Sequence, residues 1–137
     1  MPLTNYSDGK LIELLLGATA YASPATVYAA LSTTTPTQAG ATFTEPVGNA
    51  YARVAYSNVA ANWPTYGAPA TGVQVANNIA ITFPQATGSW GTVTYIGLFD
   101  AASLGNLLAY GVLGTAQTIN NGDTLTVPID GLAILLN

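Results

Sequence analysis

The sequence feature that most constrains the fold is the stretch of residues 89–101, which reads SWGTVTYIGLFDA. Its Thr, Val, Tyr, Ile and Phe side chains favour the pleated, half-buried surface of a β-strand. Polar and apolar residues alternate at its start, so Val93 and Tyr95 are expected to share one face, whereas the stretch from Ile96 onward is apolar on both faces. This pattern is typical of a strand that leaves a sheet edge and enters a buried centre. We therefore expect a central strand here, with both faces of residues 96–99 covered.

Shorter segments of the same character lie on either side, and turn residues separate them. They predict further strands near residues 26–32, 51–57, 73–75, 79–83, 107–113, 125–129 and 132–136. Asn121-Gly122 is the signal of a tight hairpin. No long helix separates the strands, so parallel crossovers are excluded, and the Cys…Trp…Cys pattern of immunoglobulin domains is absent. The predicted fold class is all-β: an antiparallel, jelly-roll-like β-sandwich forming one domain over residues 1–137.

One short helix is expected near the N-terminus, over residues 6–17, where leucines recur at three- and four-residue intervals. Ser7 or Asp8 can cap its first turn, and Gly17 suits its end. Such a short helix must pack on something to be stable. Residues 1–5 have no predicted structure of their own and are a candidate arm.

The composition narrows the classes of function. Only 6% of the 137 residues are charged, against about 25% in an ordinary soluble domain, and the net charge is −4. This surface suits burial against other protein, although an uncharged β domain without such a role has the same composition. Lys10 and Arg53 are the only basic residues, too few for a phosphate backbone, so no nucleic acid is expected. There is no cysteine or histidine, and no apolar run long enough for a membrane helix, so neither cofactor nor membrane is expected.

The acidic residues predict turns and caps rather than catalysis. A glycosidase needs two carboxylates that face one groove. Asp8 is predicted to cap the helix, and Glu13 to lie on its solvent-exposed face. Asp100 and Asp130 are predicted to be turn residues. Residues 121–123 could hold calcium, but a hairpin turn explains them as well. We therefore expect no catalytic residue, no metal site and no enzymatic activity.

Two irregular stretches, residues 33–48 and 58–72, are too long for ordinary sandwich turns. They carry Phe43, Trp63 and Tyr66. Aromatic side chains of this kind are common anchors of protein interfaces, so all three are interface candidates. The alternative is that they close the end of the sandwich.

Arg53 is a fourth interface candidate because it is the only guanidinium in the chain. It could clamp a partner's carboxylate with two hydrogen bonds. It could also pair internally with Glu45 or Asp100 and tie the first irregular stretch to the sheet.

A series of motifs that spans nearly the whole chain resembles a family of small virion proteins of tailed bacteriophages, whose members are often labelled tail fibre or minor tail proteins. In size and strand pattern the chain also resembles the small jelly-roll cement, or decoration, proteins of phage heads. The motifs are LLG (15–17), YAALST (28–33), EP (45–46), YAR (51–53), ITFP (81–84), WGTVTYIGLFDA (90–101), NLLAYG (106–111) and NNGDTLTVPIDGLAI (120–134).

This resemblance implies a structural role on the virion, without catalytic residues. The first expectation is a capsid cement protein that binds the major capsid protein and copies of itself, as a homodimer or homotrimer, and bridges capsomers. The alternatives are a tail fibre or minor tail component, or a carbohydrate-binding module in which Trp63, Tyr66 or Tyr56 stacks on sugar.

Overall fold

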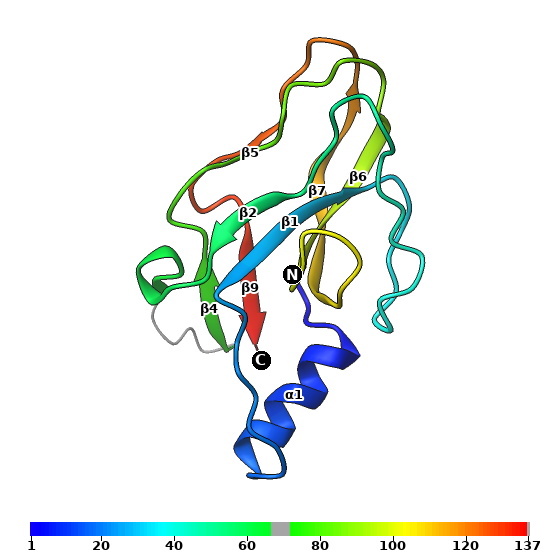
Figure 1. The fold of residues 1–137 in the computed structure, drawn as a ribbon. Coiled ribbons are helices and arrows are strands. Elements are labelled where there is room, and N and C mark those ends of the chain that lie inside the picture. The colour runs from blue at the N-terminus through cyan, green and yellow to red at the C-terminus, as the bar shows by residue number, and fades with distance from the viewer. Residues whose placement is uncertain (67–71, 137) are drawn as a thin grey trace.

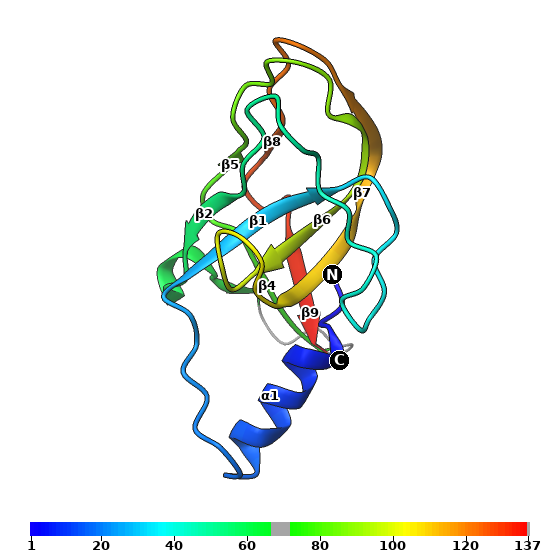
Figure 2. The same cartoon turned by 45° about the vertical axis from the view of Figure 1, so that its right-hand side comes forward.

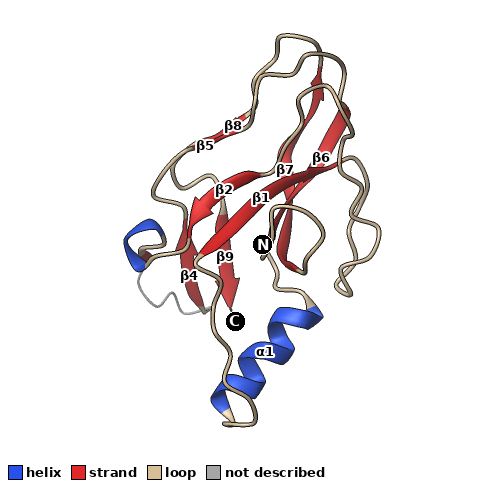
Figure 3. Ribbon diagram, viewed as in Figure 1, coloured by secondary structure: helices blue, strands red, loops and turns tan. Residues whose placement is uncertain are grey.

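A computed structural model describes residues 1–66 and 72–136 and shows an all-β sandwich with one α-helix outside it (Figures 1 and 3). Every pair of neighbouring strands is antiparallel. The fold class expected from the sequence is therefore confirmed.

One layer of the sandwich is a four-stranded sheet with the order β2-β1-β6-β7. Strand β6, which was predicted to be the central strand, is paired on both sides, and β7 lies at an edge. The strands comprise β1 (Thr26–Ser32), β2 (Val54–Ser57), β6 (Gly91–Phe99) and β7 (Leu107–Ile119).

The second layer consists of two small sheets, β3-β4-β9 and β5-β8. The jelly-roll part of the prediction is not confirmed, because a jelly roll has two larger sheets. The elements are η1 (Ala60–Asn62), β3 (Thr65–Tyr66), β4 (Val73–Ala76), β5 (Ile81–Thr82), β8 (Thr126–Val127) and β9 (Ala133–Leu136).

The main hydrophobic core lies between the two layers. Ile96 and Leu98 of β6 pack there against side chains of the second layer such as Ile81. On the opposite face of β6, Phe99 belongs to a smaller cluster with Ala30 and Leu107. Residues 96–99 are buried throughout, as the apolar pattern predicted.

The prediction that Val93 and Tyr95 share one face of β6 is wrong, because the strand pairing is irregular there. Val93 is fully buried in the main core together with Ile96, whereas Tyr95 is only half-buried. The register against β7 shifts between Val93 and Tyr95. Between these two pairs one residue of β6 lies opposite four residues of β7, so the extra residues of the bulge belong to β7 and the regular pleat of the two strands is interrupted there.

The turn at Asn121-Gly122 forms as predicted, but it does not join a hairpin. Gly122 has φ of +90°, and the Asp123 carboxylate accepts a hydrogen bond from the Asn120 backbone N–H at 2.8 Å. The strands on either side pair with other partners: β7 with β6, and β8 with β5. The turn therefore carries the chain from one layer to the other.

The helix α1 spans Asn5–Leu15, and its cap is Thr4 rather than Ser7 or Asp8. The Thr4 hydroxyl accepts a hydrogen bond from the Ser7 backbone N–H. Gly17, with φ of +68°, ends the helix in a left-handed conformation. Figures 1 and 2 show that α1 projects away from the sandwich at the end opposite the β5–β8 sheet.

The first four residues are fixed along the edge of β7, which corrects their interpretation as a free arm. Leu3 forms a β-bridge with Ala109, and the Thr4 N–H donates to the Leu108 carbonyl at 3.0 Å. The Met1 amino group donates to the Ala133 carbonyl of β9 at 2.8 Å. The segment therefore links the last strand of one sheet to the second layer.

Candidate functional site

The carboxylates make contacts typical of turn residues. Asp100 accepts hydrogen bonds from the Asn106 backbone N–H at 2.7 Å and from its side-chain amide at 2.8 Å. The Asp123 carboxylate is engaged within its own turn. Within residues 1–66 and 72–136, no group of three or more Asp, Glu, His or Cys residues is close enough to hold a metal ion. The α-helix in the described part of the chain is too short to cross a membrane.

Arg53 is occupied inside the molecule. Its side chain is only 7% exposed, and its Nε and Nη2 atoms lie 3.0 and 2.7 Å from the Glu45 carboxylate. Its Nη1 atom donates to the carbonyls of Ala101 at 2.7 Å and Leu104 at 2.9 Å. Of the two sequence interpretations, the structure shows the internal pair, and with Glu45 rather than Asp100. The guanidinium therefore fastens two loops together.

Phe43, another of the interface candidates, covers the outer face of the four-stranded sheet. Its ring meets that of Phe99 edge to face, with centroids 5.1 Å apart, and the Arg53 guanidinium lies 3.6 Å from the Phe99 ring centroid. A Cβ atom on Gly97 would lie 2.6 Å from the Phe43 ring and 2.7 Å from Leu107. The glycine in β6 therefore allows the loop to sit directly on the strand.

Tyr51 belongs to the same network. It was not among the candidate residues predicted from the sequence. Its hydroxyl donates to the Glu45 carboxylate at 2.8 Å and accepts from the Leu31 N–H at 2.9 Å. Burial raises the pKa of Tyr51 far above its usual value. The sequence held no signal for this role beyond the closeness of the EP and YAR motifs.

Trp63 follows η1 and packs on Tyr56, with ring centroids 4.8 Å apart. Tyr56 is buried, so the pair does not form an open platform for sugar stacking. The Trp63 Nε1 atom is buried and has no hydrogen-bond partner among the described residues. The backbone of Tyr66 pairs with Gln74, but its side chain lies outside what the structure describes.

Trp63 also lines an apolar groove of about 560 Å³ between α1 and the sandwich, here called the helix groove. Leu11, Leu14 and Lys10 of α1 form one wall of the groove, and Ile134 of β9 lies on the opposite side. Among the described residues that line it, Lys10 is the only charged one, and it pairs with Glu13 at 2.8 Å.

The end of α1 carries three exposed aliphatic side chains, here called the helix tip: Ile12 at 57% exposure, Leu15 at 73% and Leu16 at 78%. Full burial of such a side chain contributes about 1.5–3 kcal/mol. The helix tip therefore leaves roughly 3–6 kcal/mol of hydrophobic free energy unused in the isolated chain.

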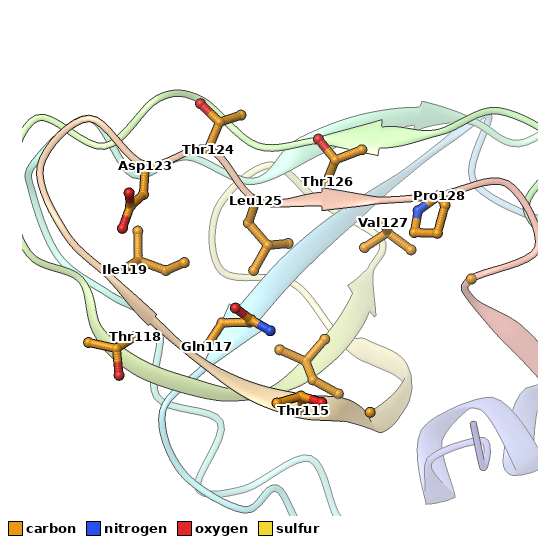
Figure 4. Close-up of a pocket in the computed structure, with 13 residues that line it drawn as sticks. Thr115, Gln117, Thr118, Ile119, Asp123, Thr124, Leu125, Thr126, Val127 and Pro128 are labelled. Atoms are coloured by element: carbon orange, nitrogen blue, oxygen red, sulfur yellow. The ribbon is translucent and has the colours of Figure 1, made fainter.

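A second hollow, of about 710 Å³, lies between β7 and β8 (Figure 4). Gln117 and Ile119 of β7 point into it from one side and Leu125 from the other, while Thr118 and Thr124 lie at its margins. Asp123 is its only charged lining residue. The lining mixes hydroxyl, amide and aliphatic groups, with no arrangement of reactive side chains.

The sequence matches a known protein family over nearly its whole length. Residues 2–135 match the model of a protein family described as podophage GP4 fiber I protein gp80. No curated protein matches the sequence. The family match covers the sandwich, the loops held by Arg53, the helix tip and both hollows.

Proposed function

Because this chain belongs to the family described as podophage GP4 fiber I protein gp80, we propose that it is a structural subunit of a fibre on the tail of a phage virion. The family makes it a phage virion structural protein. The family match over residues 2–135 is the observation that carries the finer proposal. It favours the tail-fibre alternative over the capsid cement protein expected first, since the family description names a fibre.

The charge distribution supports assembly by protein contacts. Both basic side chains of the chain are paired with its own carboxylates, Arg53 with Glu45 and Lys10 with Glu13. Threonine, asparagine, alanine and glycine supply much of the remaining chain. Such a surface can be buried over a large area with little cost of charge desolvation. We propose that its partners are other virion proteins and further copies of itself, bound through many weak contacts.

The paired charges also support a role without catalysis. The side chains with the strongest polar contacts, Arg53, Glu45 and Tyr51, fasten loops to the sheet and line neither hollow. We propose that the protein is not an enzyme. Incubation with cell-wall polysaccharide should release no product.

Locating the protein on the particle tests the proposed function. An epitope tag at the exposed loop residue Val47 can be labelled with gold and imaged by cryo-electron microscopy of intact virions. We expect a few labels per particle, confined to the tail. Hundreds of labels spread over the head would reject the fibre proposal and support the capsid cement hypothesis instead. An antibody to the major capsid protein serves as the control for head labelling.

A further inference from the structure

We propose that the helix tip of one copy of this chain docks into the helix groove of a second copy. The inference rests on the proposed function as a fibre subunit, and it names the contact by which copies join. The helix tip is Ile12, Leu15 and Leu16, and the helix groove is the apolar hollow that Trp63 lines.

The helix tip is an apolar cluster that no described residue covers. Ile12 and Leu15 lie in the last turn of α1, Leu16 directly follows it as the C-cap residue, and all three side chains are more than half exposed. That turn contains no basic residue, and its one acid, Glu13, is paired with Lys10. Apolar side chains that are exposed together on one surface can mark a site of protein contact. The cluster therefore has the character of a contact surface.

A single copy cannot bring its helix tip into its own helix groove. Leu11 and Leu14 of α1 already form a wall of that groove, whereas Ile12, Leu15 and Leu16 do not line it. Because the helix stands between the two features, they can meet only when they belong to different copies. Figures 1 and 2 show α1 standing clear of the sandwich, which leaves it accessible to a neighbour.

The area is sufficient for the core of a stable interface. An aliphatic side chain presents roughly 100 Å² of apolar surface, so each helix tip leaves roughly 200 Å² uncovered. If each copy both gives a tip and receives one, two such contacts with the matching groove walls bury roughly 800 Å² in total. This is about half of a standard interface of about 1,600 Å², and the polar rim supplies the remainder.

The charges allow this docking. The helix tip is neutral, and the one charged side chain among the described residues of the helix groove, that of Lys10, has its partner on the same helix. Docking therefore buries no unpaired charged side chain of these two surfaces in an apolar contact. A tip-to-groove contact joins two different surfaces, and it can close into a ring of two or three copies.

The first test is the mass of the full chain in solution, measured by light scattering during size-exclusion chromatography. The wild type is expected at two or three times the 14.0 kDa of one chain. Leu15→Lys should weaken association at least tenfold and return the mass to that of one chain. A lysine suits the C-terminal turn of a helix, so the circular dichroism spectrum and melting temperature should be unchanged. Val47→Lys is the matched control, because Val47 is 92% exposed and does not line the groove.

The second test identifies the two surfaces. The natural chain has no cysteine, so single cysteines report contacts cleanly. A Leu16→Cys variant mixed with a Ser23→Cys variant, in which the thiol lies at the groove, should form a disulfide-linked pair. A Val47→Cys variant mixed with the same Ser23→Cys variant should not.

Three outcomes would overturn the inference: a wild-type chain that stays monomeric at high concentration, a Leu15→Lys variant that associates like the wild type, or equal crosslinking from Val47→Cys. The last two would assign association to another surface. These outcomes are distinguishable from failure of the proposed function. A chain found on the tail but monomeric would reject the docking alone, and a chain that associates through the helix tip but coats the head would reject the fibre role alone.

Discussion

Strand β6 and helix α1 both contain several aliphatic residues, but those of β6 are buried and those of α1 are not. Ile96 and Leu98 of β6 are 5% and 3% exposed, whereas α1 contains no buried residue. β6 has a neighbouring strand on each side and side chains packed over both faces. An apolar pattern in the sequence therefore indicates that a surface will be covered, but not whether the covering residues belong to the same chain.

The two regions should therefore contribute differently to stability. The sandwich keeps its apolar surface inside one chain, so removing a core side chain should lower the free energy of unfolding. α1 is held chiefly at its first turn, where Thr4 and Ser7 bond to β7. Substitutions at its far end should leave folding almost unchanged.

The largest expected effect is that of Phe99→Ala, which removes a buried ring from beneath Phe43 and Arg53. Deleting a buried aromatic side chain costs about 3–5 kcal/mol. The variant should unfold at a clearly lower urea concentration than the wild type. An unchanged midpoint would show that the outer face of β6 does not help to hold the fold.

Arg53→Ala should have the next largest effect, about 2–4 kcal/mol, because the Glu45 carboxylate loses its cationic partner and two loop carbonyls lose their donor. Chemical denaturation measures the loss. Glu45→Gln is a useful companion, since it keeps the size of the side chain and removes only its charge. If Arg53→Ala were as stable as the wild type, the guanidinium would contribute nothing to holding the two loops together.

Tyr51→Phe should cost about 1–3 kcal/mol, since the buried Leu31 N–H loses its acceptor. It should also change the response to alkaline pH. The pKa of Tyr51 is raised in the folded state, so its contribution is complete below its ordinary value of about 10 and falls as the pH rises above it. The stability of the wild type should therefore decline above pH 10 more steeply than that of Tyr51→Phe. Parallel declines would contradict the role of the buried hydroxyl.

The smallest expected effect on folding is that of Leu16→Ala, within about 0.5 kcal/mol, because this side chain is 78% exposed. The measurement must be made at low protein concentration, where association does not add to stability. A loss as large as that of Phe99→Ala would show that the helix tip packs within its own chain, and the contrast between α1 and β6 would disappear.

The elements with strong local patterns could be predicted from the sequence. β1 has the bounds that the alternation gave, and the uninterrupted apolar run of residues 96–99 marked the centre of the sheet. The helix was predicted because its leucines recur at helical spacing. In each case, neighbouring residues alone carry the signal.

Features set by contacts between distant residues could not be predicted. Thr4 became the helix cap because β7 holds it in place, and Phe43 found its position through Gly97, more than 50 residues along the chain. The Arg53–Glu45 pair was one of two alternatives that the sequence left open, and only the approach of the two loops decides between them. The interface candidates Phe43, Trp63 and Tyr66 stay predictions, and Trp63 lines the helix groove, whereas no sequence pattern singled out the exposed aliphatic residues of α1.

The attachment of the first residues along β7 and β9 has a consequence for the order of folding during synthesis. The partners of residues 1–4 are the backbone of β7 and, for Met1, the carbonyl of Ala133. This segment is synthesised before the strands that it contacts, and its docking site is complete only when nearly the whole sandwich has emerged. It must wait unpaired while the strands between form, and contacts so distant in sequence are slow to close. Residues 1–4 are thus expected to be among the last parts of the sandwich to settle, and their docking would mark the completion of the fold.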